Sequence, residues 1–116
     1  LQSMILNSIE YFFDNRRAVV FVTKKMIADA NVEEQEMEGI ASIPRSIEGV
    51  DVGVTVRQKG DIEWKVSIRT SEQVSATDIC KVFGGGGHLR AAGFTVSGSK
   101  DDVKSKILSC IKDKIG

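Results

Sequence analysis

Two neighbouring runs of alternating apolar and polar residues constrain the fold of this chain most strongly. They occupy residues 50–58 (VDVGVTVRQ) and 62–70 (IEWKVSIRT), and Lys59-Gly60-Asp61 between them has the composition of a turn. The apolar positions are Val50, Val52, Val54, Val56, Ile62, Trp64, Val66 and Ile68. A period of two is typical of strands with one buried face, so we predict an antiparallel β-hairpin. The side chains expected to point away from the core are Glu63, Lys65, Ser67 and Arg69.

The segments on either side of this hairpin predict further strands and helices. Residues 18–23 (AVVFVT) are continuously apolar and β-branched, as in a strand buried on both faces, and residues 92–98 (AGFTVSG) predict a last strand. Helical spacing of apolar residues predicts helices over residues 4–13, 33–43 and from Ser99 or Lys100 to Ile115, with helical turns over 24–30. Asp14-Asn15 is expected to form a turn, and Pro44, the only proline, is expected to end the second helix.

One more helix is predicted between the hairpin and the last strand. Ser75 and Asp78 have the spacing of a capping box, and the apolar face that follows comprises Ile79, Val82 and Phe83. Helices therefore alternate with strands along the chain. This order predicts an α/β domain, with a mixed sheet of four to five strands, flanking helices and the antiparallel hairpin.

Composition limits the class of protein. The 116 residues suit one domain, which we place at residues 4–116 because Leu1-Gln2-Ser3 resembles a tag remnant. Lys and Arg balance Asp and Glu at 16 each, which argues against attraction of duplex nucleic acid to the whole surface. No apolar run has the length of a membrane span, and no signal-peptide pattern occurs. Cys80 and Cys110 are expected to be reduced, partly buried thiols of a cytoplasmic protein.

Four consecutive glycines, Gly84 to Gly87, stand between the predicted helix and the last strand. Glycine loses more backbone freedom on folding than any other residue, so the run needs a reason. Three readings are open: a flexible hinge, a close approach of backbone to another element, or a nest of N–H groups that receives phosphate oxygens. A Walker A loop requires lysine after its last glycine, where this sequence has His88. A Rossmann loop requires a further glycine where this sequence has Leu89, so the run fits neither motif.

His88, the only histidine, directly follows the glycines and could donate to a phosphate oxygen. Together with Arg69 it would form a small cationic pocket. Each residue also has a structural interpretation, a core histidine or an exposed arginine paired with an acid. The acidic residues are scattered, so no metal-ligand set is expected in this chain.

The stretch FGGGGHLRAAGFTV, residues 83–96, resembles the G-G-G-H-x-x-A-A-G motif of the DHH-associated domain, the C-terminal domain of DHH-family phosphoesterases. The upstream stretches EGIASIPRSIEGVDVGVTVRQ and KVSIRTS agree in order and spacing, so the resemblance covers the chain from about Arg17 onward. The subfamily resembled is the oligoribonuclease type, which includes nanoRNases, phosphoadenosine phosphatases and exopolyphosphatase-related proteins. Cyclic-dinucleotide phosphodiesterases and, more distantly, alanyl-tRNA synthetases carry related domains.

This resemblance implies that the domain grips substrate phosphates with its glycine loop, His88 and the arginine of an S-x-R strand, here Ser67 and Arg69. Arg90 lies at a variable position of the motif and is a further phosphate candidate. Ala91 and Ala92 are expected to serve packing. Arg45 is a weaker candidate, since the local pattern does not say which way it points.

The family's Asp-His-His run is missing from this sequence. The resemblance therefore implies an excised substrate-binding domain that binds no metal and is inactive alone. Manganese would be held by a DHH domain of the same parent enzyme, and substrates would be short oligonucleotides or small nucleotide phosphates. No membrane partner is expected, and relatives that dimerise make a homodimer one candidate state. The alternative is a stand-alone nucleic-acid or tRNA-binding module, against which the absence of aromatic residues among the exposed hairpin positions argues.

Overall fold

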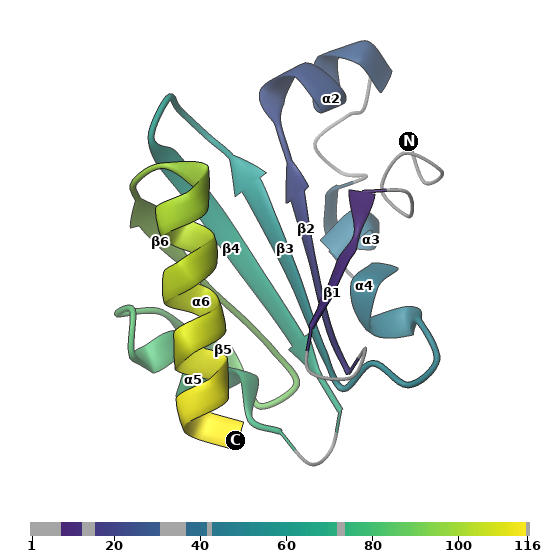
Figure 1. Cartoon of the computed structure of the whole chain (residues 1–116), viewed down its shortest axis with the longest axis vertical. Helices are drawn as coiled ribbons and strands as arrows, with labels where there is room; N and C mark the ends of the chain where they lie inside the picture. Colours follow the sequence, from purple (N-terminus) through teal and green to yellow (C-terminus); the bar gives the residue numbers. More distant parts are fainter. Residues whose placement is uncertain (1–7, 13–15, 31–36, 42, 72–73, 116) are drawn as a thin grey trace.

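The computed structural model describes residues 8–12, 16–30, 37–41, 43–71 and 74–115. Its centre is a six-stranded mixed sheet in the order β1-β2-β3-β4-β6-β5 (Figure 1). The strands are β1 Glu10–Phe12, β2 Arg17–Val22, β3 Val52–Gln58, β4 Glu63–Thr70, β5 Gly86–His88 and β6 Ala91–Ser97. Strands β2 and β3 are parallel, and every other pair is antiparallel. The predicted α/β class is confirmed, whereas the prediction of four to five strands is wrong because β1 and β5 were missed.

Helices lie on both faces of this sheet (Figure 1). They are α2 Lys24–Ala30, α3 Met37–Ala41, α4 Ile43–Ser46, α5 Ala76–Lys81 and α6 Lys100–Ile115. The core on one face joins α5 and α6 to the sheet and includes Trp64, Ile68, Ile79 and Ile107. A smaller core on the opposite face joins α2, α3 and α4 to β2 and includes Val20, Val22 and Ile40. No helix in the described part of the chain is long and apolar enough to cross a membrane.

The central hairpin follows its predicted alternation in β4. Trp64, Val66 and Ile68 are buried, while Glu63 and Lys65 are exposed and Ser67 and Arg69 are half-buried. Only Ile62 departs from the prediction: it is 63% exposed, because the strand begins one residue later at Glu63.

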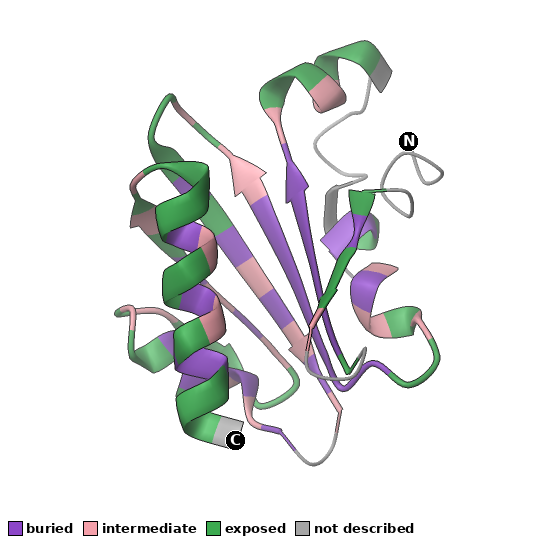
Figure 2. Ribbon diagram, in the orientation of Figure 1, coloured by how far each residue is buried: buried purple, intermediate pink, exposed green. Residues whose placement is uncertain are grey.

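Strand β3 differs from the prediction of a single buried face. Its first five residues are all buried, including Gly53 and Thr55 on the supposedly open side (Figure 2). The reason is tertiary: α3 and α4 cover this face, and the Thr55 hydroxyl donates to the carbonyl of Ala41 at 3.4 Å. Strand β2 is buried on both faces as predicted.

The N-terminal prediction of a helix over residues 4–13 is wrong from Glu10 to Phe12, although Ser8 is helical. Glu10–Phe12 forms β1, an edge strand paired with β2 in the register Glu10↔Val19. Phe12 packs against the main core, and Glu10 accepts a hydrogen bond from Nζ of Lys104 on α6 at 2.9 Å. These long-range contacts outweigh the helical spacing of the local apolar residues. Residues 4–7 and the predicted turn at Asp14-Asn15 lie outside the described residues.

Pro44 does not end a helix but lies in the first turn of one. Helix α3 ends at Ala41, and Pro44 is the second residue of α4. Proline is compatible with this position because the first N–H groups of a helix need no partner within it. Of the helix predicted over 33–43, residues 33–36 and 42 lie outside the described part of the chain.

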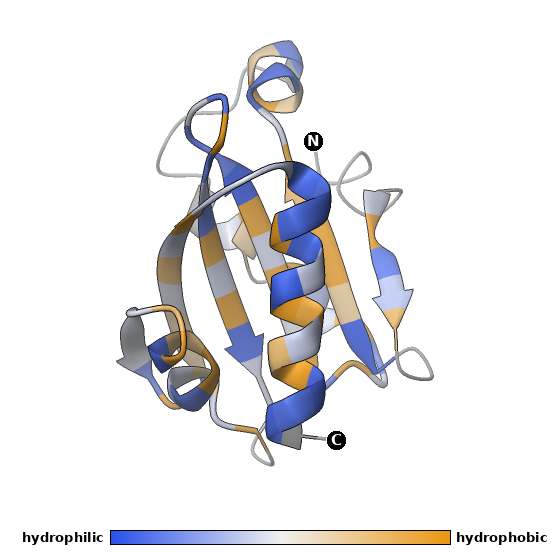
Figure 3. Ribbon diagram, turned by 60° about the vertical axis from the view of Figure 1, so that its left-hand side comes forward, coloured by the Kyte–Doolittle hydropathy of each residue, from blue (hydrophilic) through white to orange (hydrophobic). Residues whose placement is uncertain are grey.

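The two remaining helices agree with prediction. Ser75 caps α5, its hydroxyl accepting from the Asp78 N–H at 3.2 Å. Helix α6 turns a hydrophobic stripe of Val103, Ile107 and Ile111 toward the sheet and a hydrophilic side outward (Figure 3). The helical turns expected over residues 24–30 form α2.

Candidate functional site

The residues singled out by the motif lie on one face of the sheet, opposite α5 and α6. Strand pairing shows this directly, since side chains that are paired across strands share a face. Arg69 pairs with Ala91, which pairs with His88, and Ser67 pairs with Gly93, which pairs with Gly86. Two parallel rows therefore cross β4, β6 and β5, one with Arg69 and His88 at its ends and the other with Ser67 and Gly86.

This face is covered over β2 and β3 but accessible over β4, β6 and β5. The described helices on this side pack mainly on β2 and β3, and α3 also approaches β4. Beyond them Lys65, Thr95 and His88 are exposed, while Ser67 and Arg69 are half-buried. The result is a shallow surface with a guanidinium, an imidazole and a hydroxyl, next to a backbone strand at the sheet edge. These groups can all donate hydrogen bonds to an anion.

Two of the four glycines are explained by the way the chain ends α5. The N–H of Gly85 donates to the carbonyl of Cys80 at 3.0 Å, and that of Gly84 to Lys81 at 3.1 Å. This pair of bonds is a Schellman motif, in which the residue at C′ is left-handed. Gly84 occupies that position with φ +81°. A β-carbon on Gly85 would overlap the carbonyl oxygen of Gly93 and lie 2.5 Å from Cβ of Phe94.

Gly87 is also required by the structure, but Gly86 is not. Gly87 has φ +147°, and its β-carbon would lie 2.8 Å from both the Ala91 carbonyl oxygen and the Ala92 Cα. At Gly86 nothing lies within 4 Å of an added β-carbon, and the residue is exposed. The close-approach reading therefore holds for Gly85 and Gly87, and Ala91 and Ala92 serve packing there as expected. The described segment is a strand hairpin rather than a loop or hinge, a point that the sequence prediction missed.

Arg90 has a structural position at the turn of the β5–β6 hairpin. Its Nη1 donates to the carbonyl of Val74 at 2.6 Å and to that of Leu89 at 3.3 Å. The N–H of Ala76 also donates to Leu89, at 2.7 Å, and the N–H of Thr70 donates to Arg90 at 3.0 Å. These bonds fix the hairpin carrying His88 to β4 and to the start of α5. A phosphate contact of Arg90 stays a prediction.

Sequence analysis missed an ion-pair cluster at the same end of the sheet. Asp51 accepts from Nη2 and Nε of Arg16 at 2.7 and 3.1 Å, and from Nη1 of Arg17 at 2.9 Å. Its backbone carbonyl accepts the N–H of Ser71, two residues beyond Arg69. The sequence feature that could have indicated this cluster is the pair of adjacent arginines, Arg16 and Arg17, at the start of a buried strand. The cluster ties the starts of β2 and β3 to the end of β4, and so supports the strand that carries Arg69.

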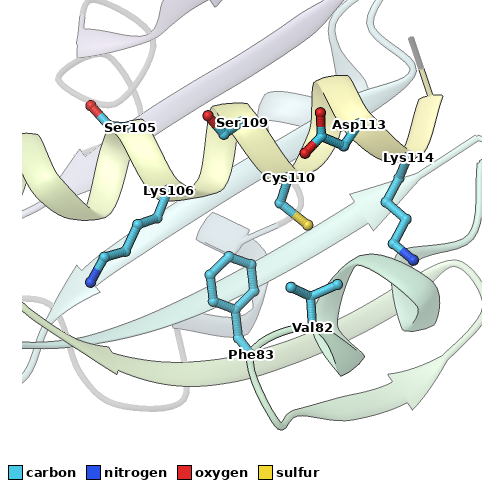
Figure 4. Close-up of a pocket in the computed structure, with 8 residues that line it drawn as sticks. All are labelled: Val82, Phe83, Ser105, Lys106, Ser109, Cys110, Asp113 and Lys114. Atoms are coloured by element: carbon cyan, nitrogen blue, oxygen red, sulfur yellow. The ribbon is translucent and has the colours of Figure 1, made fainter.

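A hollow of about 470 Å³ lies between the C-terminal end of α5 and α6, lined by Val82, Phe83, Ser105, Lys106, Ser109, Cys110, Asp113 and Lys114 (Figure 4). It is on the other face of the sheet and contains none of the motif residues. Val82 was predicted to pack on the core, but it is 56% exposed because α5 ends at Lys81. Three of its eight lining side chains are apolar (Val82, Phe83 and Cys110), and the other five are polar or charged. We place the phosphate chemistry with the histidine and arginine instead.

Both cysteines are free and buried, and Cys110 lines this hollow. Burial, with a smaller effect of the neighbouring Cys110, raises the pKa of Cys80 from 9.0 to about 11. Burial also raises the pKa of Cys110. Both groups are therefore thiols at neutral pH.

The raised pKa of Cys80 predicts a loss of stability in alkali. The thiol ionises first in the unfolded chain, so the free energy of unfolding should fall as pH rises from 9.0 toward about 11. We expect a smaller fall in Cys80→Ala than in the unchanged chain, and an unchanged fall in Ser109→Ala. Urea unfolding at a series of pH values measures it. If the free energy of unfolding depends on pH equally in the unchanged chain and in Cys80→Ala, the pKa of Cys80 is not raised in the folded state.

The described residues bring no three His, Cys, Asp or Glu side chains together in a group that could hold a metal ion. What the arrangement can do with its own groups is bind and orient an anion.

Comparison with known proteins assigns the fold and the motif to a family. Residues 15–115 match the DHHA1 domain. The chain belongs to the DHHA1 domain family. This confirms the resemblance of its glycine-histidine motif to the DHH-associated domain of DHH-family phosphoesterases.

Individual relatives resemble this DHHA1 domain to different degrees. The bifunctional oligoribonuclease and PAP phosphatase NrnA of Thermus thermophilus is 32% identical over 116 residues, which cover 99% of this chain and 34% of that protein. An exopolyphosphatase-related protein from Bacteroides fragilis has the same fold with a TM-score of 0.86 at 22% identity, covering 97% of this chain and 33% of that one. This DHHA1 domain thus spans about a third of the length of these relatives.

Two more distant structures share the fold alone. The pGpG-specific phosphodiesterase PggH from Vibrio has a TM-score of 0.61 at 11% identity, with 97% of this chain and 38% of that chain covered. The C-Ala domain of Aquifex aeolicus alanyl-tRNA synthetase has a TM-score of 0.63 at 19% identity, with 93% and 98% covered.

Proposed function

We propose that this DHHA1 domain binds the phosphate groups of short oligonucleotides or small nucleotide phosphates for a DHH-family phosphoesterase. The observation that carries the proposal is the placement of Ser67, Arg69, Gly86 and His88 in two adjacent rows on one accessible sheet face. The similarity to an oligoribonuclease and PAP phosphatase supports the substrate class. The local character of the site fits a short substrate, because the chain carries no net charge with which to attract a long one.

Each group has a distinct part in holding phosphate. Arg69 would provide charge and a planar pair of N–H donors, which suits phosphate oxygens. His88 would add an imidazole donor and Ser67 a hydroxyl donor. β5 has one neighbour among the described strands, so the N–H groups on its other side can point to ligand. Gly86, which no packing contact requires to be glycine, leaves that edge open to close approach.

Hydrolysis would need groups that we place outside this domain. In the proposal a DHH domain of the same parent chain holds manganese and activates water, and this domain presents the phosphate to it. This domain by itself would then bind ligand without hydrolysing it. The cytoplasm is the compartment in which such nucleotide substrates occur and in which two free thiols persist.

Mutation of Arg69 and His88 tests the proposal. We expect Arg69→Ala and His88→Ala each to weaken binding of the dinucleotide pApA by about tenfold to a hundredfold, the effect of losing a charge-assisted hydrogen bond. Binding would be measured by NMR titration of the backbone amides. Lys106→Ala, on α6 at the opposite face, is the matched loss of one positive charge and should leave affinity unchanged. Equal weakening in all three variants would show a general charge effect and no site.

Gly86→Ala separates a ligand role of the glycines from a packing role. We expect it to leave folding intact, because the β-carbon meets no atom, and to weaken pApA binding severalfold, because it narrows the approach to the strand edge. If a folded Gly86→Ala domain binds pApA as tightly as the unchanged domain, the glycine run serves packing and not ligand binding.

The tRNA-binding alternative has the similarity to the C-Ala fold in its favour. Single-stranded RNA is commonly held by aromatic side chains on an exposed sheet. On the described accessible face, the positions of β4 and β6 hold Glu63, Lys65, Ser67, Arg69, Ala91, Gly93, Thr95 and Ser97. Trp64 and Phe94 belong to the opposite, buried face. We therefore favour phosphate binding over base stacking.

A further inference from the structure

The last residue of β4, Thr70, is bonded to the turn that follows His88. Its N–H donates to the carbonyl of Arg90 at 3.0 Å, and its hydroxyl donates to the carbonyl of Leu89 at 3.2 Å. Thr70 directly follows Arg69 in the chain, just as Leu89 directly follows His88. Arg69 and His88 are therefore each one residue away from a direct connection between β4 and the β5–β6 turn.

Thr70 makes its side-chain bond on the face of the sheet that is turned away from the proposed ligand. Side chains alternate between the two faces of a strand, so Thr70 lies with Ile68 on the face covered by α5 and α6, and Arg69 lies on the accessible face. Thr70 is only 5% exposed. An effect of this hydroxyl on ligand binding must therefore pass through the position of other residues.

The hydroxyl belongs to a small network of hydrogen bonds. Its single proton lies between two carbonyls, because the carbonyl oxygen of Val74 is also close, at 2.7 Å. Nη1 of Arg90 donates to the same two carbonyls, at 2.6 Å to Val74 and at 3.3 Å to Leu89. The Leu89 carbonyl also accepts the N–H of Ala76, at the start of α5. Buried networks of this kind make the segments that they join rigid.

The separation of Arg69 and His88 decides whether both can bond the same anion. Two strand spacings lie between their Cα atoms, about 9–10 Å, with the small Ala91 between them. Groups that bind one ligand together must be held within about 0.5 Å of the productive geometry by supporting contacts. The bonds of Thr70 to the β5–β6 turn are such contacts.

We infer that Thr70 is a positioning residue for phosphate binding. Its hydroxyl holds Arg69 and His88 at the separation at which both donate to one phosphate group, and it does not contact the ligand. The inference rests on the proposed function, since it takes Arg69 and His88 as the phosphate ligands. Arg90 supports the same arrangement through the two carbonyls that it shares with Thr70.

Thr70→Val tests the inference, because valine keeps the branched shape and loses the hydroxyl. We expect it to weaken binding of pApA about fivefold to tenfold in the NMR titration, the effect of losing one hydrogen bond. Thr70→Ser keeps the hydroxyl and should bind within about twofold of the unchanged domain. The matched control is Thr55→Val, which also removes a buried hydroxyl bond of the sheet, the one to Ala41, and should leave pApA affinity unchanged.

A double-mutant cycle separates positioning from a general loss of structure. In a domain that already carries His88→Ala, Thr70→Val should weaken pApA binding by less than about twofold, because no separation of two ligands is left to set. The same factor with and without His88 would overturn the inference. So would unchanged affinity in a folded Thr70→Val domain, an equal loss in Thr55→Val, or a loss in Thr70→Ser as large as in Thr70→Val.

Thr70→Ala is the second variant if Thr70→Val does not fold, since valine places a methyl group where the hydroxyl lies 2.7 Å from the carbonyl of Val74. Alanine leaves room for water at that carbonyl, and we expect the same loss of affinity and the same dependence on His88. Failure of the proposed function is a different result, in which Arg69→Ala and His88→Ala leave pApA affinity unchanged. A loss in those two variants without a loss in Thr70→Val or Thr70→Ala would overturn this inference alone.

Discussion

Gly85→Ala is expected to lower the free energy of unfolding by about 3 kcal/mol or more, the upper range for overpacking a well-packed site. The new β-carbon would overlap the carbonyl oxygen of Gly93 and lie 2.5 Å from Cβ of Phe94. Neither neighbour can move easily. Gly93 belongs to β6, and the ring of Phe94 is stacked on Phe83 with centroids 4.3 Å apart. Urea unfolding followed by circular dichroism would measure the loss.

Gly86→Ala is the matched control, at the next residue, where β5 begins. Its β-carbon meets no atom, and Gly86 is not among the glycines with positive φ. The substitution should change stability by less than about 1 kcal/mol, and a small gain is expected from the reduced freedom of the unfolded chain. If both variants lose the same stability, the β5–β6 hairpin is not packed as described.

Asp51→Ala is expected to lower the free energy of unfolding by about 3–5 kcal/mol, the cost of leaving a buried charge without its partner. Arg17 is only 4% exposed, and its Nη1 donates to Asp51 at 2.9 Å. The substitution also removes the acceptor of Arg16, and it affects the place where β2, β3 and the end of β4 meet. Denaturant unfolding measures this loss of free energy, and the NMR shift of the Ser71 amide reports the structural change at residue 51.

Glu10→Ala provides the comparison for Asp51→Ala. Glu10 also pairs with a cation, Lys104, at 2.9 Å, but its side chain is 44% exposed. Exposed pairs contribute about 0–1 kcal/mol, so the loss should be small. A loss in Asp51→Ala as small as that in Glu10→Ala would mean that water reaches Arg17 and solvates it.

Local pattern was enough to predict the hairpin, the last helix and the cap of α5. Alternation in residues 62–70 is a property of one strand with one buried face, and it placed Ser67 and Arg69 on the outer face without knowledge of any partner. The Ser75 cap is likewise a contact between residues three apart. The family resemblance pointed to His88 and the glycines, and the sheet register places His88 in the same row as Arg69, with Ala91 between them.

Local pattern failed where a contact far along the chain decides the conformation. Residues 10–12 have helical spacing but join the sheet edge, where β2 offers them backbone hydrogen bonds. The buried outer face of β3 depends on α3 and α4, and its Thr55 bonds to Ala41, 14 residues earlier in the chain. Gly86–His88 are a different case: their partner β6 begins only three residues after His88, but a three-residue segment with two glycines has no strand pattern to predict it.

The hairpin, strands β2 and β6 and helices α5 and α6 thus follow from periodicity and capping, which act over a few residues, while the family resemblance pointed to the groups of the site. The alignment of Arg69 and His88 in one row, the burial of Arg17 against Asp51 and the need for glycine at positions 85 and 87 come from tertiary structure. The physical reason is that strand register and helix seating are set by backbone hydrogen bonds and close packing between distant segments. At Gly53 and Gly85 the absence of one β-carbon lets those segments meet.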